Sequence, residues 1–268
     1  MSLVSQPKPT FNWLPSSYLK TPKGYVLMVV LILSVIAGFG SNDFAGFKNV
    51  GIAVFTAVLL DVLFALRQNR KRIFPDGSVI TGLIIGIILS PATPWYLTVV
   101  TSMFGIISKH LFKLKRKPIF NPAAFGLFAA CFLSAGQSWW AALPELPGWC
   151  IVFLLVGGFM ITKRINKFPL VFAFLGVYFL VVLFMGLFNV GDALDALRTP
   201  YVNSTLFLAF FMLTDPPTSP VTYKQQIIFG GLAALVALFI YVQFQWLGFL
   251  LLGLLAANVW FTINKSLK

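Results

Sequence analysis

Ten apolar segments alternate with short polar stretches along the 268 residues of this chain. Most of them reach the roughly 17–25 residues that a helix needs to cross a bilayer. They are continuous runs and do not alternate with period two, which favours helices over the strands of a barrel. We therefore expect an all-α integral membrane protein with about ten transmembrane helices, near residues 24–40, 46–66, 78–90, 94–112, 119–135, 148–162, 168–188, 200–214, 225–242 and 246–263.

The third and eighth segments are shorter than the rest. As helices, Ser78 to Ser90 and Pro200 to Thr214 would each cover only about 20 Å. Both run into proline-rich stretches, at residues 90–94 and 214–220. We expect these two segments to be broken helices.

Composition and charge place the chain in a membrane and orient it there. With 59% hydrophobic and 10% charged residues, it has too few polar side chains to coat a water-soluble globule. Lys and Arg near helix ends stay on the cytoplasmic side, and ten crossings with a cytoplasmic N-terminus leave only Lys48 and Arg198 outside. We expect a bacterial inner-membrane protein with both termini in the cytoplasm. The net charge of +13 is then spread over the inner loops and does not indicate nucleic-acid binding.

Three internal sequence matches, made in order along the chain, indicate a duplication. The paired stretches are residues 22–25 with 146–149, 81–90 with 205–214, and 126–130 with 253–257. We therefore divide the chain into a cytoplasmic tail (1–23), a first five-helix repeat (24–145) and a second five-helix repeat (146–268). The apolar run that follows the tail is expected to be an uncleaved signal anchor. Because five is odd, the second repeat enters the membrane from the opposite face, and such inverted repeats commonly frame a central site.

Candidate binding or pathway residues follow from the broken helices, since paired interrupted segments mark the binding sites of many transporters. Unwound backbone beside hydroxyl groups can bind a polar ligand or a cation. The alternative is that these hydroxyls bond back to the preceding helical turn and only join helices together. The hydroxyl residues are Ser78, Thr81, Ser90 and Thr93 in the third segment, and Ser204, Thr205, Thr214 and Thr218, with the neighbouring acid Asp215, in and after the eighth.

Two asparagines extend this candidate set. Asn121 precedes Pro122 and is expected to cap the fifth helix, or to aim that helix start at an anionic or carbonyl group. Asn258 lies deep in the last apolar segment and should face protein.

Asp61 is the only acid inside a predicted span. It is either neutralised by Arg67 or another loop base, or it serves as an ion or proton site. His110 is expected to be solvated in a basic loop, and the Trp139–Trp140 pair to lie exposed at the outer membrane interface. The two cysteines lack the spacing of a metal site, and we expect no metal.

Four blocks of sequence stand out, at Asp76 to Leu83, Pro94-Trp95, Ile119 to Gly126 and Phe211 to Thr218. They resemble the NqrB/RnfD family, which supplies membrane subunits of the sodium-pumping NADH:quinone reductase and of the Rnf electron-transport complex. The resemblance implies a ten-helix inverted-repeat fold, also similar to urea channels, and flavin-linked electron transfer coupled to ion movement alongside other membrane redox subunits.

One departure from the family affects the cofactor. Members with covalent flavin carry Ser/Thr-Gly-Ala-Thr in the loop after the fifth span, whereas residues 134–140 here read Ser-Ala-Gly-Gln-Ser-Trp-Trp. We do not expect covalent FMN, while non-covalent FMN or riboflavin remains open. The alternative function is a channel or transporter for a small flavin-like or urea-like solute that uses the same fold.

Overall fold

The structure is a computed structural model of the chain, and it describes residues 10–11, 18–41, 44–70, 72–115, 117–133, 135–190 and 193–266. Most of the predicted cytoplasmic tail lies outside these ranges. Ser134, the first residue of the loop used to argue against covalent FMN, also lies outside them. The same holds for four of the basic residues that the charge analysis assigns to the cytoplasmic side: Lys8, Lys71, Arg116 and Lys268.

The described residues are almost entirely helical, which confirms the predicted all-α class. Two very short strand pairs are the exceptions: β1 (Thr10–Phe11) runs parallel to β2 (Arg72–Ile73), and β3 (Lys113–Leu114) antiparallel to β4 (Lys117–Pro118). The α-helices are α1 (Pro22–Ser41), α2 (Ala45–Arg67), α3 (Asp76–Ile88), α4 (Trp95–Leu111), α5 (Pro122–Cys131), α6 (Ile151–Ile165), α7 (Phe168–Leu187), α8 (Thr199–Phe207), α9 (Tyr223–Phe244) and α10 (Phe249–Ser266).

Single-turn elements complete the chain. The 3₁₀ helices are η1 (Tyr18–Lys20), η2 (Trp140–Ala142), η3 (Gly148–Cys150) and η4 (Ala193–Leu197), and the π-helix η5 (Leu208–Met212) continues α8.

Each predicted apolar segment contains one of these helices, but their lengths differ. Among the described residues, six helices are long and apolar enough to cross a membrane: α1, α2, α6 with its preceding turn, α7, α9 and α10. The structure thus shows an integral membrane protein with several membrane-spanning helices.

The third and eighth segments are short helices, as their proline-rich ends predicted. Helix α3 ends where Leu89 becomes extended, and Leu89 then bridges Gln137. Helix α8 changes to the π-helix η5, and the chain turns away after Met212. Each break therefore directly follows its helix.

The fifth segment is shorter than predicted. Asn121 and Pro122 start α5 late, and the helix ends at Cys131 instead of continuing to residue 135. The following loop folds back into the protein: Ser138 and Trp139 donate their backbone N–H groups to the Ile88 carbonyl, and the Trp140 indole donates to the Gly86 carbonyl.

The tryptophan prediction was wrong for the same reason. Trp139 and Trp140 are 6% and 7% exposed and lie in the core instead of at a membrane interface. An indole N–H needs an acceptor, and the Gly86 carbonyl in the last turn of α3 supplies one to Trp140 inside the protein.

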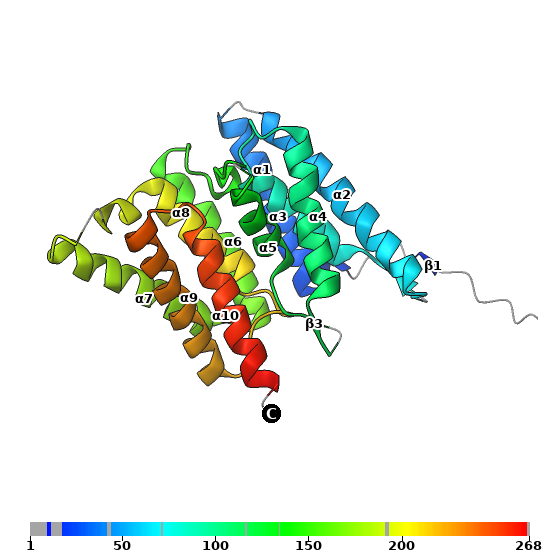
Figure 1. The fold of residues 1–268 in the computed structure, drawn as a ribbon. Helices are drawn as coiled ribbons and strands as arrows, with labels where there is room; N and C mark the ends of the chain where they lie inside the picture. Colours follow the sequence, from blue (N-terminus) through cyan, green and yellow to red (C-terminus); the bar gives the residue numbers. More distant parts are fainter. Residues whose placement is uncertain are drawn as a thin grey trace, which may run out of the picture.

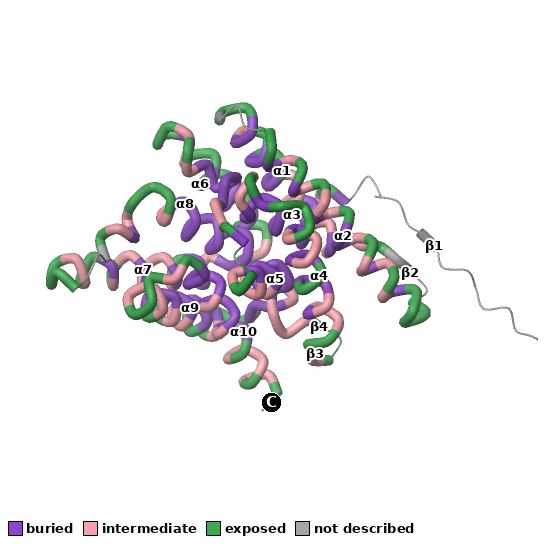
Figure 2. Tube along the Cα trace, turned by 45° about the horizontal axis from the view of Figure 1, so that its top comes forward, coloured by how far each residue is buried: buried purple, intermediate pink, exposed green. Residues whose placement is uncertain are grey.

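The two halves of the chain lie side by side (Figure 1). Helix α1 contacts α6, and α5 contacts α10, so the halves meet through helices at equivalent places in the order. Buried residues gather around α3, α5 and α8 in the middle, and exposed ones lie at the helix ends and outer faces (Figure 2).

Glycines set the closest helix contacts in both halves. A Cβ atom on Gly126 of α5 would lie 2.5 Å from the Thr101 carbonyl oxygen of α4. A Cβ on Gly253 of α10 would lie 2.4 Å from the Ala233 carbonyl oxygen of α9. Small residues let membrane helices approach closely. The 126–130 and 253–257 match in the sequence thus corresponds to matching helix contacts.

Candidate functional site

A cavity of about 290 Å³ lies between the two halves, and we call it the vestibule. Its wall comes from the first turns of α1, α3 and α5, the ends of α2 and α4, and the chain from η5 onward. It is lined by Pro22, Lys23, Val26, Asp61, Arg70, Phe74, Asp76, Gly77, Ile80, Thr81, Ile84, Lys109, Pro118, Asn121, Pro122, Ala123, Ile165, Phe211, Thr214, Asp215, Pro216 and Pro217.

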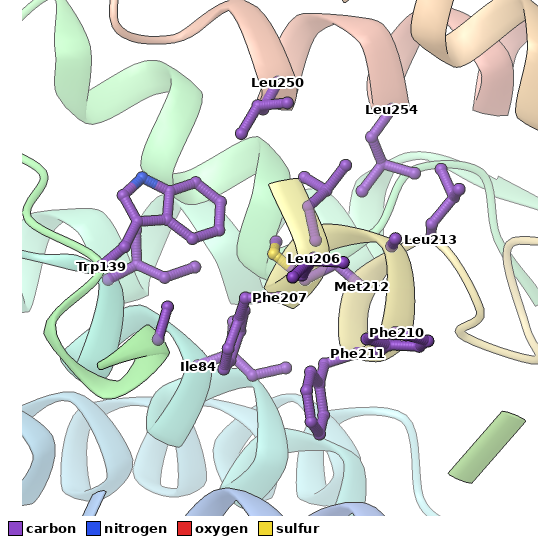
Figure 3. Packing of buried hydrophobic residues seen from close by; sticks show 14 of the residues in the cluster. Ile84, Trp139, Leu206, Phe207, Phe210, Phe211, Met212, Leu213, Leu250 and Leu254 are labelled. Atoms are coloured by element: carbon purple, nitrogen blue, oxygen red, sulfur yellow. The ribbon is translucent and has the colours of Figure 1, made fainter. Parts of the chain in front are cut away.

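Beyond the vestibule the interior is closed by apolar side chains, shown in Figure 3. Phe207 and Phe211 stack with ring centroids 4.7 Å apart, and Trp139 meets Phe207 edge-on at 6.1 Å. Ile84 comes from α3 on the other side, and Leu250 and Leu254 from α10. We call these residues the apolar plug. Among the described residues, the side chains at this end of the vestibule are therefore buried and apolar.

Asp61 forms the centre of the charged wall. Its Oδ1 accepts hydrogen bonds from Lys109 Nζ at 3.0 Å and from His110 Nε2 at 2.7 Å. Lys109 also donates to Ser78 Oγ at 2.9 Å, which brings α2, α3 and α4 together at one point. Asp61 is therefore neutralised by a base, as one of the two predicted alternatives required, although the base is Lys109 instead of Arg67.

The prediction of a solvated His110 was wrong. Its side chain is 2% exposed and stacks on Phe64 with centroids 4.4 Å apart. Its Nδ1 faces Gln68 Nε2 and Lys113 Nζ, both at 3.3 Å, and these groups can only donate. Nδ1 is thus the acceptor, and Nε2 carries the proton that is donated to Asp61.

A second ion pair lies at the start of α3. Lys23 Nζ is 2.9 Å from Asp76 Oδ2, while Asp76 Oδ1 accepts from the Gly77 N–H at 2.7 Å. The nearest atoms to a Cβ placed on Gly77 are Lys109 Nζ and Lys23 Nζ, at 3.7 and 3.8 Å. Two ammonium groups therefore flank the N-terminus of α3, where the helix dipole is also positive.

Asn121 connects the two halves at the inner wall. Its Oδ1 caps α5 by accepting from the Ala124 N–H, and its Nδ2 donates to the carbonyl of Met212 at the end of η5. Its own N–H donates to Asn258 Oδ1 at 3.0 Å, and Asn258 Nδ2 donates to the Thr218 carbonyl at 3.1 Å. The predicted cap and the predicted inward orientation of Asn258 are both present, and the two asparagines bond each other.

The segment after η5 is held by its own polar contacts. Thr218 Oγ1 donates to Asp215 Oδ2 at 2.9 Å, and Lys167 Nζ donates to the Pro220 carbonyl. Lys167 lies between α6 and α7 and is 4% exposed, and this burial lowers the pKa of its ammonium group to about 8. An ammonium group thus fixes the unwound backbone of the second half.

The predicted site residues separate into three groups. Thr81, Asn121, Thr214, Asp215 and Asp61 line the vestibule. Ser78, Thr218 and Asn258 bond residues of its wall. The rest lie outside it: Ser90 and Thr93 beyond the C-terminal end of α3, and Ser204 and Thr205 in α8.

Several hydroxyls follow the alternative reading, in which they bond their own helix. Thr81 donates to Gly77, Ser204 to Pro200 and Thr214 to Phe210.

Three residues of the vestibule wall were not predicted as site residues from the sequence: the basic residues Lys23 and Lys109 and the aromatic Phe211. A signal for Lys109 existed, because it ends an apolar helix and Asp61 needed a partner. Within the described residues, no group of three or more His, Cys, Asp or Glu side chains is placed to hold a metal ion.

Comparison with known proteins agrees with this architecture. The model of the NQR2, RnfD, RnfE family matches the chain twice, at residues 20–146 and 137–264. An ion-translocating oxidoreductase complex subunit of Aliivibrio salmonicida, of the RnfD type, is 23% identical, over 83% of this chain and 86% of the relative.

Two relatives of the same name come from Yersinia. The Yersinia pseudotuberculosis serotype O:1b protein is 28% identical over 85% of this chain, which spans 61% of that relative's length. The Yersinia enterocolitica protein is 32% identical over 45% of this chain and 36% of the relative. Because the family match covers nearly the whole chain, in two copies, this protein belongs to the NQR2, RnfD, RnfE family.

Proposed function

We propose that this chain is the membrane subunit of an electron-transport complex that couples redox chemistry to ion movement across the membrane. The observation that carries the proposal is the double family match together with relatives named as a subunit of an ion-translocating oxidoreductase complex. Other redox subunits of the membrane are its expected partners. They would supply the electron donor and acceptor sites.

We further propose that the vestibule binds flavin non-covalently. Ligand pockets of about 300–1,000 Å³ are lined mainly by apolar groups with a few polar contacts, and the vestibule approaches this range. Ile80, Ile84 and Phe211 offer apolar contact for a flat ring. Lys109 and the Asn121 cap offer hydrogen bonds at its edge. Flavin would supply the capacity to accept and pass on electrons, while these residues bind and orient it.

In the proposed orientation the chain crosses the bacterial inner membrane ten times as two inverted five-helix repeats. Both termini and the mouth of the vestibule, with Lys23, Arg70 and Lys109, then face the cytoplasm, as the preference of Lys and Arg for that side requires. Fusions that report compartment, joined after Lys268 and inserted after Arg198, are expected to report cytoplasm and periplasm respectively. The same compartment at both points would contradict the ten-crossing arrangement.

The apolar plug favours electron transport over the alternative of an open channel. A polar solute entering the vestibule would meet Phe207 and Phe211, which are 1% and 3% exposed and stacked on each other. Moving a polar group into such a dry region costs several kcal/mol. A redox cofactor needs no such passage.

Flavin binding has a direct test in the visible absorption spectrum of the detergent-purified chain. We expect flavin absorbance that appears in the supernatant after acid precipitation, because the cofactor is held without a covalent bond. Replacing Ile80→Trp fills the vestibule and is expected to weaken flavin binding by about tenfold or more, which corresponds to about 1.4 kcal/mol of binding free energy.

Ile52→Trp is the matched control, because Ile52 lines a shallow apolar groove on α2 and α4, away from the vestibule. This variant should retain flavin. Absorbance that stays with the pellet would contradict non-covalent binding. A colourless protein that does not bind added FMN or riboflavin would overturn the flavin proposal and support the small-solute transporter.

A further inference from the structure

The first half of the chain has a second polar locus, where α3 ends and its backbone unwinds. Asn49 of α2 donates through Nδ2 to the carbonyls of Ser90 and Pro91, at 3.0 and 3.3 Å. The Thr93 N–H donates to the same Ser90 carbonyl at 2.9 Å. Asn49 and Thr93 are therefore neighbours around one backbone oxygen.

Two side-chain oxygens at this locus, Asn49 Oδ1 and Thr93 Oγ1, are buried and have no hydrogen-bond partner in the described part of the chain, and the same holds for Thr98 Oγ1 in the first turn of α4. Asn49 and Thr98 are 0% exposed and Thr93 is 5% exposed. The Asn49 amide has one possible orientation, because both partners of Nδ2 are carbonyls that can only accept. Buried polar atoms without partners are rare in native proteins and require an explanation.

The packing of α2 on α4 places Thr98 at the level of this locus along the helices. Asp61 of α2 meets His110 of α4, and Gly51 and Ile52 line one groove with Val99. The two helices therefore run in the same direction in one register. Counting back equally along both helices from Asp61 and His110 places Asn49 at the level of Thr98.

The electrostatics of the locus favour a cation. The C-terminal end of α3, which carries the negative end of the helix dipole, points toward Leu89 and Ser90. The free atoms are all oxygens. In the described part of the chain the Ser90 carbonyl already accepts two hydrogen bonds, whereas the Pro91 carbonyl accepts one. Unwound carbonyls beside the C-terminal end of a half-helix are the features with which transporters coordinate Na⁺. A divalent ion would need carboxylates, and none is among these ligands.

The second half differs at its own break, where the Lys167 ammonium bonds the Pro220 carbonyl. In that half, the ammonium group of the Lys167 side chain already lies beside the unwound backbone. In the first half, Asn49 supplies only an amide.

We propose that Asn49, Thr93 and Thr98, with the Pro91 carbonyl, form a binding site for a small dehydrated monovalent cation. The inference deepens the ion-coupled function proposed above by giving it an ion site apart from the vestibule. Cation binding here needs neither flavin nor partner subunits, so the two proposals fail separately.

The test uses the full-length chain in detergent, with NaCl compared with choline chloride at equal ionic strength. Because a ligand that binds only the folded state stabilises it, we expect Tm to be about 3 °C or more higher in sodium. Thr98→Val has nearly the same shape but lacks the oxygen, and is expected to lose this difference. Thr101→Val is the matched control, because the Thr101 hydroxyl already donates to the Leu97 carbonyl.

Equilibrium binding of radioactive sodium is the second measurement, and Thr93→Val the second variant in case Thr98→Val does not fold. We expect one saturable site per chain, weakened about tenfold or more in either variant and unchanged in Thr101→Val. Equal Tm in sodium and choline with no saturable binding would overturn the proposal and leave a water molecule as the occupant. Sodium binding that survives in both variants would overturn the assignment of these residues.

Discussion

Replacing Asp61→Ala is expected to lower the free energy of unfolding by about 2–3 kcal/mol. The change leaves the Lys109 ammonium without its counter-ion and the His110 Nε2–H without its acceptor in a site where Asp61 is only 9% exposed. Removing one partner of a fully buried pair costs about 3–5 kcal/mol. We expect less because the Lys109 side chain is 21% exposed. Thermal unfolding of the detergent-purified protein measures the loss.

The double variant Asp61→Ala with Lys109→Met separates a structural ion pair from a site for mobile ions. If the pair joins α2 to α4, removing both charges recovers about 1 kcal/mol of the loss, because no unpaired charge remains. Asp195→Ala is the control, since it breaks the exposed Asp195–Arg198 pair, and exposed pairs contribute little. An Asp61→Ala protein with unchanged stability and an altered pH or sodium dependence of turnover would instead identify Asp61 as the ion or proton site.

Replacing Gly126→Ala or Gly253→Ala is expected to destabilise the protein by about 1–3 kcal/mol. The added methyl group would lie 2.5 Å from the Thr101 carbonyl oxygen in the first case and 2.4 Å from the Ala233 carbonyl oxygen in the second. Both obstacles are helix backbone, so relief requires α5 to move from α4, or α10 from α9. Thermal unfolding is the measurement for both variants.

Gly51→Ala and Gly176→Ala are matched controls within long helices of the same protein. A Cβ at either position meets nothing within 4 Å. Alanine favours the helix by up to about 1 kcal/mol over glycine, so these variants should be neutral or slightly more stable. If Gly126→Ala behaved like Gly51→Ala, the close helix contacts described above would be incorrect.

The positions of the helices were predictable from the sequence because hydrophobic runs of bilayer length have few alternatives. The short third and eighth helices were also predictable, because proline removes a backbone donor and disfavours helical geometry in the residue before it. The Asn121 cap followed from the same local chemistry. The early end of α5 was not predictable, since it depends on a loop that returns to bond Gly86 and Ile88 of another helix.

Side-chain partners were the harder part of the site. Arg67 was an obvious partner for Asp61 by sequence distance, but residues six apart on a helix point to different sides, whereas those three or four apart are neighbours. Lys109 and His110 reach Asp61 because α4 packs beside α2. The burial of His110 also could not be predicted from the sequence, because it depends on packing against Phe64 of the distant helix α2.

The sequence by itself determined the membrane class, the order and approximate bounds of the helices, the two breaks and the internal duplication. Each of these depends on local hydrophobicity, on proline, or on similarity between two stretches of the same chain. The tertiary structure decided which polar residues meet. It placed Thr81, Asn121 and Thr214 around the vestibule and stacked Phe207 on Phe211. In the described part of the chain it left one side-chain oxygen each of Asn49, Thr93 and Thr98 without a hydrogen-bond partner. These arrangements depend on the packing of helices distant in sequence, and no local pattern along the chain encodes that packing.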